Sequence, residues 1–184
     1  MLGTGASPPS RRSCTRWLAS AVFFAAFAIS GPVAADALKI RAALLYRFAT
    51  FTTWPESAFG DKSEPACFAI VGDSALADAL REIVKTKRLH GRAIEVVSLS
   101  RRKTRRHCQV VYFGNTASKR ISTGAMPDPI LTVGTADSFL ERGGMIYLFR
   151  EGNKFKFSAS REAAERANLR LSSKLLRFAK EVID

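Results

Sequence analysis

Short apolar runs alternate with helical segments along most of this chain, and that alternation constrains the fold more than any other feature. Four runs rich in apolar and β-branched residues are predicted to be strands. They comprise residues 67–72, 93–99, 108–114 and 129–134. After the first run, a helix is predicted from Ser74 to Lys85, because Asp73 and Ser74 can cap it and apolar side chains recur at helical spacing. Strands that alternate with helices are typical of α/β proteins.

A further helix is predicted where the folded region begins, over residues 38–53. Leu44, Phe48 and Phe51 recur there at the spacing of one buried helical face. The pair Trp54-Pro55 is predicted to end the helix, because a residue before proline is disfavoured in the α region.

The carboxy-terminal third predicts a hairpin followed by two helices. Residues 145–150 and 154–158 alternate in polarity around a Glu-Gly-Asn turn, as two antiparallel strands do. Ser160 is predicted to cap a helix that runs to Ala167, and residues 172–183 are predicted to form the last helix. The expected fold class is therefore α/β, a single compact domain with a mixed β-sheet flanked by helices.

The first 35 residues have the order of a secretory signal peptide. Three arginines precede an apolar run at residues 17–30, and small side chains at residues 33–35 precede Asp36. The apolar run is shorter than the about 20 residues that a membrane-spanning helix needs. Residues 1–35 are therefore predicted to be cleaved on export, which leaves residues 36–184 as the mature domain.

The charge of the mature domain indicates an anionic partner. The whole chain has a net charge of +13, and removal of the three leader arginines leaves 26 basic and 16 acidic side chains, a net charge of +10. Export argues against nucleic acid as the partner and favours membrane headgroups, acidic polymers or acidic proteins.

One basic tract follows the second predicted strand, and its cations lie close together: Arg101, Arg102, Lys103, Arg105 and Arg106. One interpretation is a solvated loop. The other is a contact surface for anionic lipid headgroups or an acidic protein. The tract lacks interleaved aromatic residues that would stack on bases, which again argues against nucleic acid.

Two cysteines remain after the leader is removed, Cys67 and Cys108. In an oxidising compartment an even pair indicates first a disulfide, with free buried thiols or a metal site as alternatives. A metal site would need further ligands, and His90 and His107 are the only histidines in the chain. The sequence therefore predicts no metal and no cofactor.

Motifs for catalysis are weak throughout. Residues 71–74 supply one glycine where a dinucleotide fingerprint needs three. No Gly-x-Ser-x-Gly elbow is present. A Cys108–His107 dyad would need a base on the neighbouring residue to reach the thiol, and neighbouring residues of a strand point to opposite faces. Gly143-Gly144 is interpreted as a turn, with a phosphate cradle as the alternative. An enzyme is therefore the least favoured class.

Eight segments, taken in order, resemble the YfiR family of small exported proteins. They comprise residues 40–55, 67–73, 89–94, 108–113 and 130–133, Phe139, and residues 143–146 and 169–179. Each segment alone is a weak signal, but their order behind a signal peptide is specific. The resemblance covers nearly the whole mature domain.

The resemblance implies a periplasmic regulator without catalytic activity. Such regulators bind the periplasmic sensor domain of an inner-membrane diguanylate cyclase and repress it, and an outer-membrane lipoprotein of the OmpA type can sequester them. The resemblance also implies a homodimer and a structural disulfide between Cys67 and Cys108. A second disulfide of some members has no counterpart here, because Gly143, Gly144 and Met145 occupy that region.

The resemblance places the partner-binding site near the last two predicted helices. The implied contact residues are Arg170, Leu171, Ser173 and Leu176, and Ser173 replaces a proline of some members. The family's Phe-Glu-x-Asn motif is changed here, at residues 157–160, so the contacts of its carboxylate and amide are not expected.

Two alternatives to this interpretation are retained. The first is structural: four apolar residues of the region pack in the core instead of binding a partner. These residues are Leu171, Leu175, Leu176 and Phe178. The second is functional: the protein is a periplasmic sensor or solute-binding module for a small ligand such as an amino acid or a nucleotide.

Overall fold

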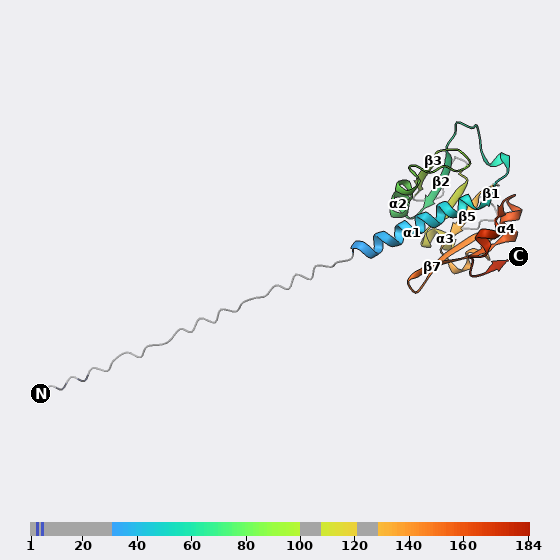
Figure 1. The fold of residues 1–184 in the computed structure, drawn as a ribbon. Helices are drawn as coiled ribbons and strands as arrows, with labels where there is room; N and C mark the ends of the chain where they lie inside the picture. The colour runs from blue at the N-terminus through green and yellow to red at the C-terminus, as the bar shows by residue number, and fades with distance from the viewer. Residues whose placement is uncertain (1–2, 4, 6–30, 100–107, 121–128) are drawn as a thin grey trace.

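A seven-stranded mixed sheet in the order β3-β2-β4-β5-β6-β7-β9 organises the chain (Figure 1). The computed structural model describes residues 3, 5, 31–99, 108–120 and 129–184. The strands of the sheet are β2 (Ala66–Val71), β3 (Ile94–Leu99), β4 (Val110–Phe113), β5 (Leu131–Gly134), β6 (Ile146–Glu151), β7 (Lys154–Ser160) and β9 (Val182–Ile183). Strands β3 to β6 are parallel, β7 is antiparallel to β6, and β9 is parallel to β7.

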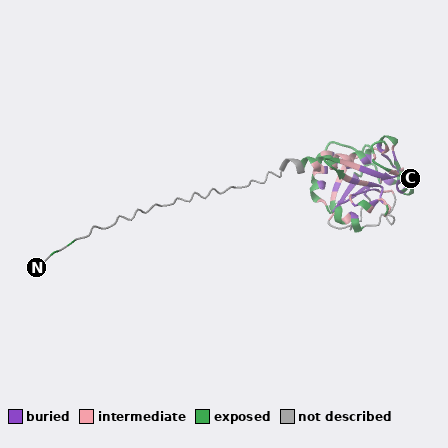
Figure 2. Cartoon of the chain, turned by 90° about the horizontal axis from the view of Figure 1, so that it is seen from below, coloured by how far each residue is buried: buried purple, intermediate pink, exposed green. Residues whose placement is uncertain are grey.

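Helices cover both faces of this sheet, as the sequence predicts for an α/β domain. The α-helices are α1 (Gly31–Thr50), α2 (Ser74–Val84), α3 (Asn115–Arg120), α4 (Arg161–Arg166) and α5 (Ser173–Leu176). Two short 3-10 helices, η1 (Glu56–Ala58) and η2 (Asp137–Phe139), lie in the connections. Figure 1 shows α1 and α2 side by side, and the buried residues form a continuous centre in Figure 2.

The larger core lies between the sheet and the helices α1, α2 and α4. Phe48 of α1 packs edge-to-face on Phe157 of β7, with ring centroids 5.0 Å apart. The smaller core lies on the other face of the sheet, where Phe113 of β4 meets Phe139 of η2 at 6.1 Å. Full burial of side chains of this size contributes about 2–3 kcal/mol each, so these two layers supply the main driving force for folding.

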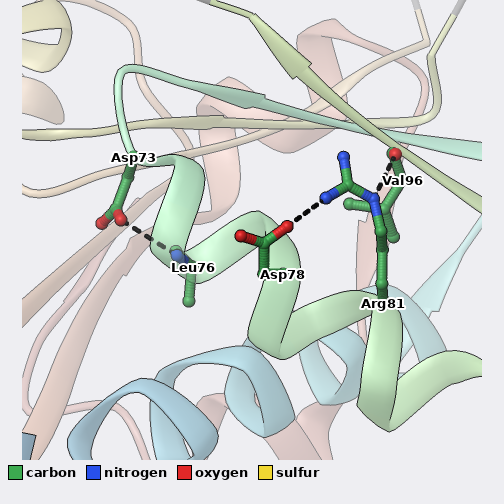
Figure 3. Close-up of polar contacts among 5 residues, drawn as sticks. All are labelled: Asp73, Leu76, Asp78, Arg81 and Val96. Atoms are coloured by element: carbon green, nitrogen blue, oxygen red, sulfur yellow. Dashed lines mark hydrogen bonds and ion pairs between the residues drawn. The ribbon is translucent and has the colours of Figure 1, made fainter. Parts of the chain in front are cut away.

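Local sequence signals determine the beginning of α2. The Asp73 carboxylate accepts a hydrogen bond from the Leu76 amide at 3.0 Å, which caps the helix as predicted (Figure 3). At the other end, the Arg81 side chain pairs with Asp78 and donates to the Val96 carbonyl at 3.2 Å. The hydrogen bond to Val96 attaches α2 to the outer strand β3.

The first helix differs from its prediction at both ends. It begins at Gly31, before the predicted cleavage point, and it ends at Thr50. Residues 51–53 leave the helix because β1 (Thr52–Thr53) pairs antiparallel with β8 (Arg170–Leu171) in a separate two-stranded sheet. The predicted stop at Trp54-Pro55 was therefore placed too late.

The buried face of α1 is also rotated from the predicted one. Phe48 is buried as predicted, but Leu44 and Phe51 are only half-buried. The fully buried positions beside Phe48 include two alanines, Ala42 and Ala49. The backbone of α1 runs close to that of α2, and small side chains are compatible with such an approach.

The predicted last helix is wrong for most of its length. Only Ser173–Leu176 form a helix, although residues 172–183 carry an apolar helical pattern. The Lys180 amide donates to the Phe157 carbonyl at 2.8 Å, and the Ala159 amide donates to the Glu181 carbonyl at 3.0 Å. Backbone groups of Lys180 and Glu181, which a helix would have bonded internally, thus form hydrogen bonds with the edge of β7. Strand β9 then extends the sheet.

The hairpin and the helix after it agree with their predictions. Strands β6 and β7 pair from Ile146↔Ala159 to Glu151↔Lys154, and Gly152 turns the chain with a positive φ of 58°. Ser160 caps α4, since its Oγ accepts a hydrogen bond from the Ala163 amide at 3.1 Å.

Candidate partner-binding surface

The carboxy-terminal segment, residues 173–183, presents the largest exposed apolar side chain of the described chain. Phe178 is 80% exposed, and Ile183 is 39% exposed. The backbone around Phe178 is held on both sides, because its amide donates to the Leu175 carbonyl at 3.0 Å and the Lys180 amide is bound to β7. The ring therefore projects into solvent from an ordered backbone.

Cations flank this aromatic ring along the segment. Lys174, Arg177 and Lys180 are all exposed. The Lys180 ammonium pairs with the Glu151 carboxylate and lies 5.5 Å from the centroid of the Phe149 ring. This hydrogen bond from Lys180 lowers the pKa of Glu151. The charge of Lys180 is thus balanced by Glu151, and the segment offers an apolar anchor beside the exposed cations Lys174 and Arg177, which suits a partner with an acidic rim.

The four residues implied by the resemblance are divided between different environments. Leu171 is 8% exposed and belongs to the larger core, so a charged side chain at this position would disrupt folding. Leu176 is half-buried, and Ser173 is exposed at the start of α5. Arg170 is exposed on β8 and lines a hollow of about 660 Å³ with Trp54 and Glu165. Their role in binding a partner stays a prediction.

The alternative that these apolar residues form core is correct for Leu171 and Leu175 and wrong for Phe178. The sequence could not distinguish them, because all lie at helical spacing. The only local signal for Phe178 is the lysine and arginine residues around it, which is also typical of an ordinary solvated helix face.

Cys67 of β2 and Cys108 are joined in a disulfide, as the pair of cysteines predicts, so the alternatives of free thiols and metal ligands are wrong. The neighbouring Gln109 supports the same junction. Its Oε1 accepts from the Cys67 amide at 2.7 Å, and its Nε2 donates to the Ala58 carbonyl at 2.6 Å. The disulfide and the buried amide together join β2, the start of β4 and η1.

The basic tract of Arg101, Arg102, Lys103, Arg105 and Arg106 lies outside the described residues. Its interpretation as a contact surface for anionic headgroups or an acidic partner stays a prediction.

The Gly143-Gly144 pair accommodates an aromatic ring. Gly143 turns the chain with a φ of 84°, and a Cβ on Gly144 would lie 2.3 Å from the Phe139 ring. Gly134 of β5 packs against the same ring, because a Cβ built on Gly134 would lie 2.4 Å from it. Close packing against Phe139 therefore explains this pair, as the turn interpretation requires, and a phosphate cradle is not needed.

The described chain contains no arrangement that suggests metal chemistry. Within residues 31–99, 108–120 and 129–184, no three His, Cys, Asp or Glu side chains lie close enough to hold a metal ion. None of the helices in these ranges has the length and hydropathy of a membrane span.

A second hollow, of about 630 Å³, lies beyond the carboxyl ends of β2, β4 and β5. We call it the switch-point crevice; among its lining residues are Arg41, Asp73, Tyr112, Thr135 and Tyr147. Tyr112 is buried in its floor, and this burial raises the pKa of Tyr112 to about 12. The Asp73 carboxylate acts in the same direction, whereas the Arg41 guanidinium opposes the shift.

The raised pKa of Tyr112 predicts a loss of stability at alkaline pH. The hydroxyl ionises near pH 10 in the unfolded chain but near pH 12 in the folded protein, so the unfolded state releases its proton first. The contribution of the protonated Tyr112 hydroxyl to the free energy of unfolding is intact below pH 10. As the pH rises towards 12, about 2–3 kcal/mol of that free energy is lost. Denaturation of wild type and Tyr112→Phe at pH 9 and pH 12 measures it. Equal alkaline losses in the two proteins would contradict this assignment.

Taken together, the described chain is an α/β sandwich whose carboxy-terminal segment is basic and exposes an aromatic ring. The family comparison is more specific: the YfiR/HmsC-like model matches residues 38–180, and the chain belongs to this family.

Comparison with solved structures supports the fold. A conserved domain protein from Vibrio cholerae O1 biovar El Tor str. N16961 superposes with a TM-score of 0.54 at 13% sequence identity. The alignment covers 79% of this chain and 60% of the other, so the chain spans less than two thirds of that protein. At this identity the similarity concerns the fold alone. No curated protein matches the chain significantly.

Proposed function

We propose that this protein works in the periplasm and represses an inner-membrane diguanylate cyclase by binding its periplasmic sensor domain through the carboxy-terminal segment. The observation that carries the proposal is the exposure of Phe178 on a backbone held by β7. Burial of an aromatic anchor in a partner pocket is typical of the residues that dominate interface energies. Family membership supplies the signalling context.

The charge around the anchor supports an acidic docking site on the partner. Lys174 and Arg177 lie exposed beside Phe178 in the sequence, and the mature domain is strongly basic. Opposite charge at the rim of an interface speeds association and aligns the two surfaces. An OmpA-like lipoprotein that binds the same segment would compete with the cyclase and release it. Pairing of two copies through this segment would give a homodimer, with the same competitive effect.

Deletion of the gene tests the proposal. Intracellular cyclic-di-GMP is expected to rise several-fold when the gene is deleted in a strain that retains the partner cyclase. In a strain without that cyclase, the same deletion is expected to leave cyclic-di-GMP unchanged. An unchanged level in both strains would contradict repression, and an equal rise in both would contradict action through the cyclase.

A further inference from the structure

The switch-point crevice lies where the strand order of the sheet reverses. From β2 the chain crosses through α2 to β3 on one side, and β4 then returns to the other side of β2. The loops that follow β2 and β4 therefore diverge, and ligands of open α/β sheets bind outside the carboxyl ends of strands at such a point. Gly72 and Asp73 follow β2, Asn115 follows β4, and all three line the crevice.

Arg41 of α1 is held at one side of this crevice. Its Nη2 pairs with the Asp73 carboxylate, and its Cζ lies 5.9 Å from the centroid of the Tyr112 ring. Asp73 is itself fixed, because its other oxygen accepts from the Leu76 amide (Figure 3). Within the described residues, the buried Nε of Arg41 has no hydrogen-bond acceptor. A buried guanidinium N–H without an acceptor is costly, so the site is suited to a ligand oxygen.

Two further polar groups of the crevice, on Tyr112 and Thr135, can donate hydrogen bonds. The Tyr112 hydroxyl is protonated at physiological pH, as tyrosines ordinarily are, and burial raises its pKa further. Thr135 follows β5, and its buried Oγ1 near Tyr112 has no partner in good hydrogen-bond geometry among the described residues. Both oxygens of Asp73 are already bound, by Arg41 and by the Leu76 amide. These donors therefore favour an anion over a cation.

The opposite side of the crevice is flat and aromatic. The hairpin of β6 and β7 extends past the end of β5, which pairs with β6 only as far as Tyr147. The rings of Tyr147 and Phe149 stack there with centroids 4.8 Å apart and planes inclined by 19°. Two aligned rings provide an apolar surface for a planar group.

We propose that the switch-point crevice binds a small planar organic anion, whose carboxylate or phosphate accepts hydrogen bonds from Arg41 and Thr135 and whose ring lies against Tyr147 and Phe149. The size of the crevice, about 630 Å³, is typical of small-molecule sites. The crevice adjoins the carboxy-terminal segment at Phe149, whose ring centroid lies 5.5 Å from the Lys180 ammonium, and it adds a ligand input to a regulator.

Titration of the exported protein with three matched probes tests the proposal. Phenyl phosphate and benzoate carry the two candidate anions on the same ring, and benzamide is the neutral control. By calorimetry, at least one anion is expected to bind at least tenfold more tightly than benzamide, and the tighter anion identifies the headgroup. In NMR titrations, the largest amide shifts are expected at Gly72, Asp73 and Thr135. Equal affinity for all three probes, or shifts confined to other regions, would overturn the site.

Variants locate the binding on Arg41. Arg41→Gln is expected to weaken the tighter anion at least tenfold, whereas Arg47→Gln, an exposed position on the same helix, is expected to bind as wild type does. Thr135→Val keeps the side-chain shape and is expected to weaken binding several-fold, which preserves the test if Arg41→Gln unfolds. If Arg41→Gln folds and binds the anion with wild-type affinity, the proposal is overturned. If Arg41→Gln does not fold, wild-type affinity in Thr135→Val overturns it instead. Either result leaves the proposed cyclase repression untouched.

Discussion

Replacement of both Cys67 and Cys108 by alanine is expected to lower the free energy of unfolding by about 4 kcal/mol. The disulfide joins residues that are separated by 41 positions in the sequence, so it removes much of the conformational freedom of the unfolded chain. Both cysteines are buried, and alanine adds no polar group at either position. For a domain of this size, the expected loss corresponds to a decrease in melting temperature of roughly 10 °C. Chemical denaturation of the two proteins without reductant measures the difference.

Reductant provides the matched control for this prediction. Addition of dithiothreitol is expected to shift the denaturation midpoint of the wild type towards that of the double variant and to leave the variant unchanged. The exported wild type, unfolded without reductant, is expected to show no titratable thiol. Two titratable thiols, or a midpoint that does not respond to reductant, would contradict a disulfide of structural importance.

The parallel strands were predictable because their signal is local. The runs at β2, β4 and β5 are short, apolar and bounded by turn residues, and each remains buried in the structure. The hairpin was predictable for the same reason, since Gly152 lies between two strands of alternating polarity. In each case local propensity and tertiary packing favour the same state.

The end of the chain was not predictable, because its structure depends on a distant partner. Apolar residues at helical spacing favour a helix over residues 172–183, but the open edge of β7 offers hydrogen bonds that the sequence near Val182 does not reveal. The same limit applies to α1, where Thr52 and Thr53 pair with residues more than a hundred positions away. Long-range pairing overrode local propensity at both places.

The candidate sites were only partly predictable for a related reason. The resemblance indicated the carboxy-terminal region, but Leu171 is core and Phe178 carries the exposed surface. Asp73 was correctly predicted as a helix cap, and its second role beside Arg41 is not visible in the sequence. These two residues are 32 positions apart and meet only because α1 crosses the end of β2.

Replacement of Phe178 by serine is expected to abolish repression of the cyclase while the domain remains folded. Because the side chain is 80% exposed, its removal should change the free energy of unfolding by no more than about 0.5 kcal/mol. Loss of a central aromatic anchor costs an interface about 2 kcal/mol or more, roughly thirtyfold in affinity. Cyclic-di-GMP in the variant strain is therefore expected to equal that of the deletion strain.

Ile40→Ser is the matched control, because Ile40 is also a large exposed apolar residue, 49% exposed on α1, far along the chain from Phe178. This variant is expected to repress as wild type does, which separates loss of an anchor from loss of surface hydrophobicity in general. Leu171→Glu cannot replace Phe178→Ser in this test, since a carboxylate buried at that position would unfold the domain and abolish repression for an unrelated reason. Wild-type cyclic-di-GMP in a strain that exports folded Phe178→Ser would show that the partner binds elsewhere, because no other described apolar side chain of this size is comparably exposed.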